Sequence, residues 1–366
     1  GLSKGDGVSY LDRVEDALQK IREEHQYREL PLRRLTDVID FSSNDYLGMG
    51  KEPQVLEALK HAKRAGSGGA RLLAGRNREL SLLEEELAEW LGRERALLFS
   101  SGYLAGVGAI PVLANVVASI YSDRANHASL IDGARLSSKP RILYEHATLP
   151  PLQASESALV VSETLFGMDG DTIDAAALLG QLREEDVLLF DEAHALGVAG
   201  PHGAGIARDL ADPRVLILGT LSKALGTLGG FVAGPAATID LFVNRARSFI
   251  FDTALPPALA LAARIALHLT RGAEDRRARL SANAERLRLV LGIAGEGPIV
   301  PVLLGEEERA MRISQRLLER RIFVPAIRPP TVPPGTSRLR VSLRADHTLE
   351  QVDLLAAELQ RCIATS

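Results

Sequence analysis

Cysteine, long apolar runs and an excess of either charge are all missing from this chain of 366 residues. The one cysteine, Cys362, cannot form an internal disulfide or a cysteine metal site, which fits a reducing compartment. The most apolar helical stretch, ALALAARIALHL, is broken by Arg264 and His268, so no segment is long enough to span a bilayer. With 43 basic and 47 acidic residues the net charge is −4, which gives no electrostatic reason to expect nucleic acid or an anionic membrane as a partner. The beginning of the chain also lacks a signal-peptide pattern, and we therefore expect a cytoplasmic protein that acts on a small molecule.

The length exceeds that of a typical single core, which favours a large domain and a smaller one. Short apolar runs alternate with helical stretches from about residue 38 to 250, the pattern of an α/β domain with a mainly parallel sheet covered on both faces. Residues 257–292 predict long helices, and the mixed strand and helix pattern after them predicts a compact α+β domain. The predicted parts are an N-terminal arm with a helix (1–37), a large domain (38–256) and a C-terminal small domain that begins with linking helices (257–366).

The segment TLSKALGTLGG (220–230) places Lys223 between small residues just after the apolar run VLILG. A second apolar run, VLLF, ends in Asp191 and is followed by His194. A lysine can bind a carbonyl cofactor as a Schiff base, and a carboxylate at the end of a buried strand can pair with the ring nitrogen of a pyridine. Taken alone, Lys223 would be an ordinary exposed lysine. Together with Asp191 and His194, and with the hydroxyl of Thr220 nearby, it indicates a pyridoxal phosphate enzyme.

The same Asp191-Glu192-Ala193-His194 run also spells DEAH, a magnesium motif of helicases. That alternative requires a phosphate loop of the form GxxxxGK[ST]. The only Gly-Lys pair, Gly50-Lys51, is followed by Glu52 and does not fit it. A nucleic-acid-dependent ATPase therefore stays a weak alternative.

Other candidate residues follow apolar runs or lie in the C-terminal part. Ser101, Gly102 and Tyr103 follow ALLF and open a helical stretch, where backbone N–H groups can hold a phosphate, although an ordinary helix cap would look the same. His127, after the run ASIY, could stack on a cofactor ring; a lone histidine is more often structural.

Two arginines near the C-terminus are candidates for carboxylate recognition. Arg328 and Arg340 each offer the two-pronged guanidinium that carboxylates prefer, against the default of a surface ion pair. The prolines of residues 329–334 predict a stiff extended loop, because they fix φ and remove donors. Such a loop could place Thr331 and Arg328 against a substrate.

The motifs, taken in order, identify a family. They are SSNDYLG (42–48), GSGGARLLAG (66–75), LFSSGY (98–103), NHASLIDGARLS (126–137), MDGD (168–171), DEAHALGVAGPHGAG (191–205), TLSKALG (220–226), FIFDTALPP (249–257) and AIRPPTVPPGTSRLRVSL (326–343). Over nearly the whole chain they resemble the α-oxoamine synthases, acyltransferases among the fold-type-I, aspartate aminotransferase-like pyridoxal phosphate enzymes. The resemblance implies that fold, pyridoxal 5'-phosphate as cofactor, no metal, and a homodimer with its active site at the subunit interface.

The resemblance also implies roles for individual residues. Lys223 would bind the cofactor covalently and act as a base, Asp191 would contact the ring nitrogen, and His127 would stack on the ring and meet the substrate. Further cofactor contacts are implied for Ser101, Gly102, Tyr103, Gly167, His194, Thr220 and, across the subunit interface, Thr253. Further substrate contacts are implied for Arg28, Asn44, Arg328, Thr331 and Arg340.

The segment AIRPPTVPPGTSRLR (326–340) is most similar to the branch of the family that joins L-alanine to a pimeloyl thioester, carried by coenzyme A or acyl carrier protein, in biotin biosynthesis. The shared motifs also fit relatives that use glycine, such as 2-amino-3-ketobutyrate CoA ligase and 5-aminolevulinate synthase, or serine. Two positions depart from the family: Gly167 replaces a common serine, and Leu80 replaces a common histidine. We expect these departures to affect fine tuning rather than the class of reaction.

Overall fold

The structure is a computed structural model whose contacts divide the chain into two compact units. It describes residues 8–24, 26–28, 38–153 and 156–365. The larger unit contains residues 41–301 and 341–357, and the smaller unit contains 1–40, 302–340 and 358–366. The division predicted from the sequence, with domain limits at residues 37 and 256, stays a prediction.

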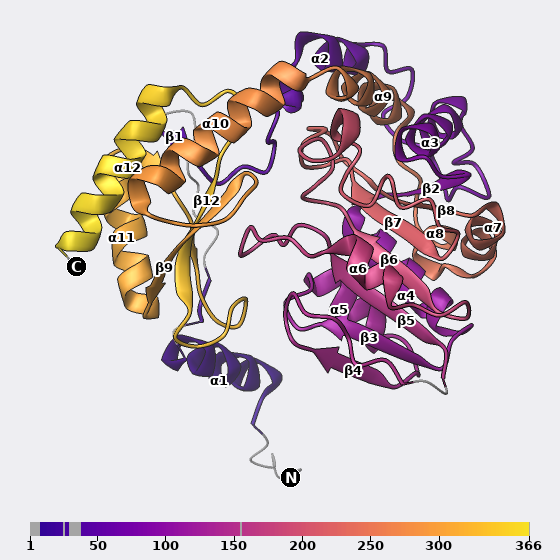
Figure 1. Ribbon diagram of the computed structural model, residues 1–366, viewed down its shortest axis with the longest axis horizontal. Helices are drawn as coiled ribbons and strands as arrows, with labels where there is room; N and C mark the ends of the chain where they lie inside the picture. Colours follow the sequence, from indigo (N-terminus) through magenta and orange to yellow (C-terminus); the bar gives the residue numbers. More distant parts are fainter. Residues whose placement is uncertain (1–7, 25, 29–37, 154–155, 366) are drawn as a thin grey trace, which may run out of the picture. The chain divides into compact units, whose positions relative to one another are not determined.

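The larger unit is built on a seven-stranded sheet (Figure 1). Its strands are β2 (Arg95–Phe99), β3 (Ser119–Asp123), β4 (Arg141–Tyr144), β5 (Ala158–Glu163), β6 (Val187–Asp191), β7 (Val215–Thr220) and β8 (Gly230–Gly234). Their order across the sheet is β2-β8-β7-β6-β5-β3-β4. The strands from β7 to β4 pair in parallel, whereas β8 runs antiparallel to both of its neighbours. The predicted mainly parallel sheet is therefore confirmed, with β8 as the exception.

The parallel strands of this sheet are buried and end in polar residues at one edge. Every residue of β3, β5 and β7 is buried, as expected for strands covered on both faces. These strands and β6 end at Asp123, Glu163, Asp191 and Thr220. The carboxyl ends of parallel strands meet at the same edge of a sheet, where open α/β folds place their ligands. The fold thus gathers these polar side chains at one edge.

Helices pack around the sheet and against one another. Helix α4 (Gly102–Ala114), which is apolar nearly all round, contacts α5 (Ala128–Arg135), α7 (Ala236–Arg245), α8 (Arg247–Ile250) and strands β2, β7 and β8. A helix without a polar face is expected to be buried on all sides. Its residues form one hydrophobic core with Leu97, Leu189 and Leu218 of the strands.

The other helices of the larger unit lie beyond this core. They are α2 (Pro53–Lys60), α3 (Arg78–Leu91), α6 (Ala175–Gly180), α9 (Pro257–Arg271), α10 (Glu274–Leu291) and the 3₁₀ turns η2 (Met49–Lys51) and η3 (Pro201–Gly203). Helix α9 packs against α2 and α3. The Asn77 side chain caps α3 by accepting a hydrogen bond from Glu79 N at 2.8 Å. In the described part of the chain, every helix is too short or too polar to cross a bilayer.

The smaller unit contains α1 (Tyr10–Glu23), β1 (Ile39–Asp40), α11 (Glu307–Glu319), β10 (Ile322–Phe323) and β11 (Ala326–Ile327). Strand β1 pairs in parallel with β10. Strands β9 (Ile299–Gly305) and β12 (Ser337–Ser342) and helix α12 (Leu349–Ala364) contribute residues to both units. Strand β11 pairs antiparallel with β12, which places the proline-rich segment 329–334 in the connection between them.

Candidate active site

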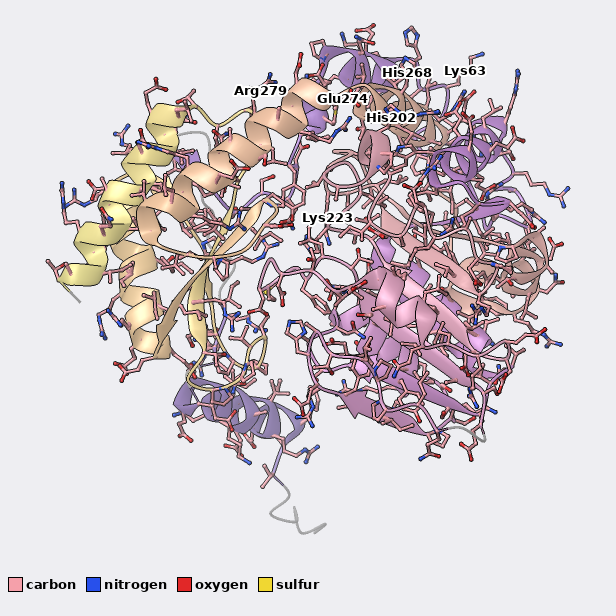
Figure 2. All side chains as sticks on the ribbon, viewed as in Figure 1. Lys63, His202, Lys223, His268, Glu274 and Arg279 are labelled. Atoms are coloured by element: carbon pink, nitrogen blue, oxygen red, sulfur yellow. The ribbon has the colours of Figure 1, made fainter. Side chains whose placement is uncertain are left out.

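Lys223 lies in a closed loop directly after β7. The loop is held by hydrogen bonds from Leu221 N to Gly229 O and from Thr227 N to Leu221 O, both at 2.9 Å. Gly226 has a left-handed φ of 63°, and a Cβ there would lie 2.1 Å from Gly50 N, so only glycine fits this turn. Figure 2 shows Lys223 well away from the other labelled residues. The loop therefore fixes the half-buried lysine at the polar edge of the sheet.

A chain of hydrogen bonds leads from Lys223 into the protein. Lys223 Nζ lies 2.8 Å from His194 Nε2, and His194 Nδ1 lies 2.7 Å from Tyr46 Oη. Tyr46 Oη donates to Asn44 Oδ1 at 3.3 Å. Tyr46 and His194 are both buried. The structure thus brings three of the predicted site residues together, and it adds Tyr46, which no sequence prediction included.

Two buried carboxyl groups lie beside the lysine. Glu163 and Asp191 are register partners in the β5–β6 pair, so their side chains lie on the same face of the sheet. Burial raises the pKa of Asp191, and the positive charge of Lys223 opposes this effect. Burial and the neighbouring Asp191 raise the pKa of Glu163 to about 8. Around neutral pH Glu163 is therefore mostly protonated, which reduces repulsion between the two groups.

Glu163 also connects two loops that carry predicted site residues. Its Oε1 accepts a hydrogen bond from His127 N at 2.7 Å, and its Oε2 accepts one from Gly167 N at 3.2 Å. His127 caps the start of α5, with Nδ1 accepting from Ser129 N at 3.2 Å. A Cβ at position 167 would lie 2.3 Å from His194 Nε2. The missing side chain at Gly167 thus leaves space for the His194 ring.

The start of α4 lies against the end of β7. Ser101 caps the helix by accepting from Leu104 N at 3.1 Å. A Cβ at Gly102 would lie 3.1 Å from Thr220 Cβ, so the first turn and Thr220 are in close contact. Thr220 Oγ1 donates to Gly229 O at 2.9 Å. The structure therefore places the predicted phosphate turn next to the loop of Lys223.

Two other predicted cofactor residues have partners elsewhere. Tyr103 donates its hydroxyl hydrogen to Asp132 Oδ2 at 2.7 Å, and its ring is partly exposed. Thr253 forms an antiparallel bridge with Ala70 in the glycine-rich loop. Its contact with the cofactor across a subunit interface stays a prediction.

Three of the predicted substrate residues, Arg28, Arg328 and Thr331, line a groove in the smaller unit. Arg28 Nη2 donates to Thr331 Oγ1 at 3.3 Å, and Arg328 Nη2 donates to Tyr27 O at 2.7 Å. The groove has a volume of about 630 Å³, and its walls include Met311, Phe323, Pro325, Ala326 and Ile327. Two guanidinium groups thus adjoin an apolar surface. Arg340, the remaining predicted arginine, is buried in β12.

Glu192, the second residue of the DEAH run, has a structural role. Its carboxylate accepts hydrogen bonds from Ile206 N at 3.1 Å and Ala207 N at 2.6 Å. Burial raises its pKa to about 7. These contacts hold the chain after His194 and explain the acidic residue without a bound magnesium ion.

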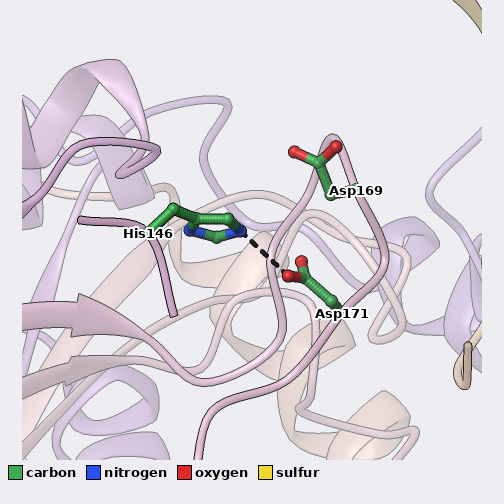
Figure 3. Close-up of side chains that lie close together, drawn as sticks. All are labelled: His146, Asp169 and Asp171. Atoms are coloured by element: carbon green, nitrogen blue, oxygen red, sulfur yellow. Dashed lines mark hydrogen bonds and ion pairs between the residues drawn. The ribbon is translucent and has the colours of Figure 1, made fainter. Parts of the chain in front are cut away.

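His146 lies beside the MDGD segment, and Figure 3 shows its ring paired with Asp171. Its Nδ1 lies 3.0 Å from Asp123 Oδ1, and its Nε2 lies 2.9 Å from Asp171 Oδ2. These two carboxylates raise the pKa of His146 to about 10. Asp169 lies close enough that the three groups His146, Asp169 and Asp171 could hold a metal, with ligand atoms within 4.8 Å of one another. A protonated imidazole paired with two carboxylates accounts for the arrangement without one.

Two residues of the site escaped the sequence predictions. Glu163 ends the apolar run ALVVS just as Asp191 ends VLLF, so its place at a strand end was a usable signal. Tyr46 belongs to the motif SSNDYLG, but it contacts His194 across 148 positions of the chain. No local sequence pattern around either residue predicts this contact.

Comparison with known proteins assigns the chain to a family. A model of the family "Aminotransferase class I and II" matches residues 36–359. The 8-amino-7-oxononanoate synthase of Methylococcus capsulatus is 44% identical over 340 residues, covering 88% of each chain. The enzyme of the same name from Bordetella petrii is 40% identical over 388 aligned positions, covering 97% of this chain and 98% of the relative.

Solved structures show the same fold. The serine palmitoyltransferase of Sphingomonas wittichii has a TM-score of 0.89 at 28% identity, with 98% of each chain covered. The S. paucimobilis serine palmitoyltransferase with a bound PLP–myriocin aldimine has a TM-score of 0.87 at 27% identity, covering 99% of this chain and 100% of that one. An 8-amino-7-oxononanoate synthase from Francisella tularensis has a TM-score of 0.79 at 27% identity, with 90% and 99% covered. The predicted fold class and cofactor are thereby confirmed.

Proposed function

The chain belongs to the 8-amino-7-oxononanoate synthases of the class I and II aminotransferase family, and from this premise we propose that it condenses L-alanine with a pimeloyl thioester. The products would be 8-amino-7-oxononanoate, carbon dioxide and a free thiol. The observation that carries the proposal is the position of Lys223, hydrogen-bonded to His194 beside two buried carboxyls at the sheet edge.

The residues around Lys223 fit pyridoxal phosphate. A buried carboxyl, Asp191, is available to the ring nitrogen, and the first turn of α4 beside Thr220 is available to the phosphate. When bound, the cofactor supplies an electron sink for breaking bonds at the amino-acid Cα. Lys223 would hold it covalently, and the exposed His127 would cover one face of its ring.

The chain's own residues would then move one proton. When the amino group of alanine takes the place of Lys223 on the cofactor, the amine of Lys223 becomes free. It would then take the proton from the alanine Cα and later return a proton to the product. His194, 2.8 Å away, would keep that amine in place. Asn44, whose side chain meets Tyr46 in the same unit, would help to hold the alanine so that the reacting bond is correctly oriented.

The groove in the smaller unit suits the acyl substrate. A pimeloyl chain carries a carboxylate at the far end of an alkyl segment. The apolar walls of the groove match the alkyl part, and Arg28 and Arg328 match the carboxylate.

A homodimer is part of the proposal, with Thr253 completing the phosphate site of the other subunit. Mixing Lys223→Ala and Thr253→Ala chains tests this directly. A mixed dimer would contain one intact site, made of Lys223 from one chain and Thr253 from the other, so activity should return on mixing. Two inactive variants that stay inactive in a demonstrated mixed dimer would contradict the shared site.

The main test is a matrix of amino acids and acyl thioesters with thiol release as the readout. We expect L-alanine with pimeloyl-CoA or the acyl carrier protein thioester to be the fastest pair. Lys223→Ala should abolish release and lose the visible absorbance of the bound cofactor. A clear preference for glycine with a short acyl-CoA would assign the chain to a sister activity instead.

A further inference from the structure

A row of side chains runs from the half-buried Asn44 through the buried Tyr46 and His194 to the half-buried Lys223, with distances of 3.3, 2.7 and 2.8 Å between their polar atoms. We propose that Tyr46 is a positioning residue that sets the ring tautomer of His194, so that an unprotonated Nε2 faces Lys223. The proposal rests on the proposed function only for the roles of Lys223 and Asn44.

The direction of these hydrogen bonds follows from the chemistry of the last group in the row. Asn44 Oδ1 is a carbonyl oxygen and can only accept, so the hydroxyl hydrogen of Tyr46 points toward it. The oxygen of Tyr46 is then left to accept from His194 Nδ1, which must carry the ring proton. A neutral imidazole protonated at Nδ1 has a lone pair on Nε2. Lys223 therefore donates to His194.

Packing around the ring supports a positioning role. Tyr46 is fully buried, and His194 is only 5% exposed, so neither side chain can exchange its partner for bulk water at low cost. Gly167 lies so close to the other edge of the ring that a Cβ would come within 2.3 Å of Nε2. The ring is thus confined by Tyr46 on one edge and by the Gly167 backbone near the other.

The consequence is that Lys223 receives an acceptor in a defined direction. If Tyr46 lost its hydroxyl, Nδ1 would have no acceptor there and the second tautomer, with the proton on Nε2, would become populated. In that tautomer Nε2 carries a hydrogen and faces the amine of Lys223, so it can no longer accept a hydrogen bond from the lysine. We expect both the tautomer ratio and the affinity for pyridoxal phosphate to change.

The direct test is nitrogen NMR of the cofactor-free, full-length chain labelled with ¹⁵N-histidine. The signals of His194 are assigned by their loss in His194→Gln. The wild-type chain should show the ring proton on Nδ1, and Tyr46→Phe should show a mixture of both tautomers. An unchanged His194 tautomer in a folded Tyr46→Phe chain would overturn the proposal.

A matched control removes a different buried tyrosine hydroxyl. Tyr121 in β3 is also buried, and its hydroxyl accepts only the distant Gln153 N at 3.3 Å among the bonds described for it. Tyr121→Phe should leave the His194 signals unchanged; a shift equal to that of Tyr46→Phe would make the effect non-specific. If Tyr46→Phe does not fold, Asn44→Leu removes the carbonyl acceptor instead and should give the same mixture. A retained Nδ1–H tautomer there would contradict the direction of the row.

The second readout is the dissociation constant of pyridoxal phosphate in a double-substitution cycle. Losing a buried hydrogen bond of this kind should weaken binding by roughly tenfold in Tyr46→Phe. If Tyr46 acts through His194, combining it with His194→Gln should add less than about threefold. Effects that multiply would show independent action and refute the role. Both readouts are independent of thiol release, so they separate this proposal from the proposed reaction.

Discussion

Substituting Gly167 by serine gives the sharpest test of the site geometry, because a side chain at this position would meet the ring of His194. Gly167 is not among the glycines with a left-handed φ, so its backbone would accept a side chain. Space is the obstacle: the new Cβ would lie 2.3 Å from His194 Nε2 and 2.8 Å from Cδ2. A comfortable contact needs roughly 3.5 Å, so the ring or the loop must move by about 1 Å.

The cost follows from what holds the ring. His194 is hydrogen-bonded at both nitrogens, at 2.7 Å to Tyr46 and 2.8 Å to Lys223, and a shift of that size breaks at least one of these bonds. Losing a buried hydrogen bond to a charged group costs about 1.5–3 kcal/mol, and overpacking alone costs about 1–3 kcal/mol. We therefore expect Gly167→Ser to weaken pyridoxal phosphate binding by roughly tenfold or more.

The assay is titration of the cofactor-free chain with pyridoxal phosphate, followed by its visible absorbance, together with denaturant unfolding. Gly180→Ser at the end of α6 is the control, because a Cβ there meets no atom within 4 Å. It should bind the cofactor like the wild type. Wild-type affinity in Gly167→Ser would refute the argument that this glycine makes room for His194.

Three further predictions concern charge and the acyl groove. The pKa of His146 is raised to about 10, so its contribution to stability is full below the unfolded pKa near 6.5 and is lost as pH rises toward 10. The unfolding free energies of wild type and His146→Ala should therefore differ by about 1–3 kcal/mol at pH 6 and converge near pH 10. A difference that does not depend on pH would contradict the ion pairs. The pKa of Glu163 is raised to about 8, so its contribution to stability is full below the unfolded pKa of about 4.5 and is lost as pH rises through 8. In denaturant unfolding, the free energy of unfolding of wild type relative to Glu163→Gln should therefore decrease between pH 5 and pH 9, and an increase would contradict the raised pKa. In thiol-release assays, Arg28→Ala should raise KM for pimeloyl-CoA by roughly tenfold or more and leave KM for L-alanine little changed. An equal rise in both KM values would argue against a specific contact with the acyl substrate.

Local patterning predicted much of the fold. Apolar runs of four or five residues between helical stretches located β2, β3, β5, β6, β7 and β8, because buried parallel strands are apolar along their whole length. The direction of β8 was beyond this signal, since an apolar run says nothing about the orientation of its neighbour. Strand β4 was missed because only its last residue is buried and its pattern is weakly apolar.

The sequence by itself determined the chemistry of the candidate site. Two consecutive apolar runs are followed by the site residues: Asp191 and His194 come after the first run, and Lys223 comes after the second. The carboxyl ends of parallel strands meet at one edge of an α/β sheet, so the sequence order alone predicted that these residues lie close together. Glu163 followed the same rule and could have been found by it.

Only the tertiary structure decided how these groups are held. Tyr46 reaches His194 across 148 positions, and the space that Gly167 leaves for the imidazole depends on two loops approaching within a few ångströms. Such contacts are set by packing of the whole core, where a single Cβ changes what fits, and no local sequence pattern encodes a distance between distant segments. The sequence therefore indicated which groups form the candidate site, whereas the fold decided which ring nitrogen of His194 meets Lys223.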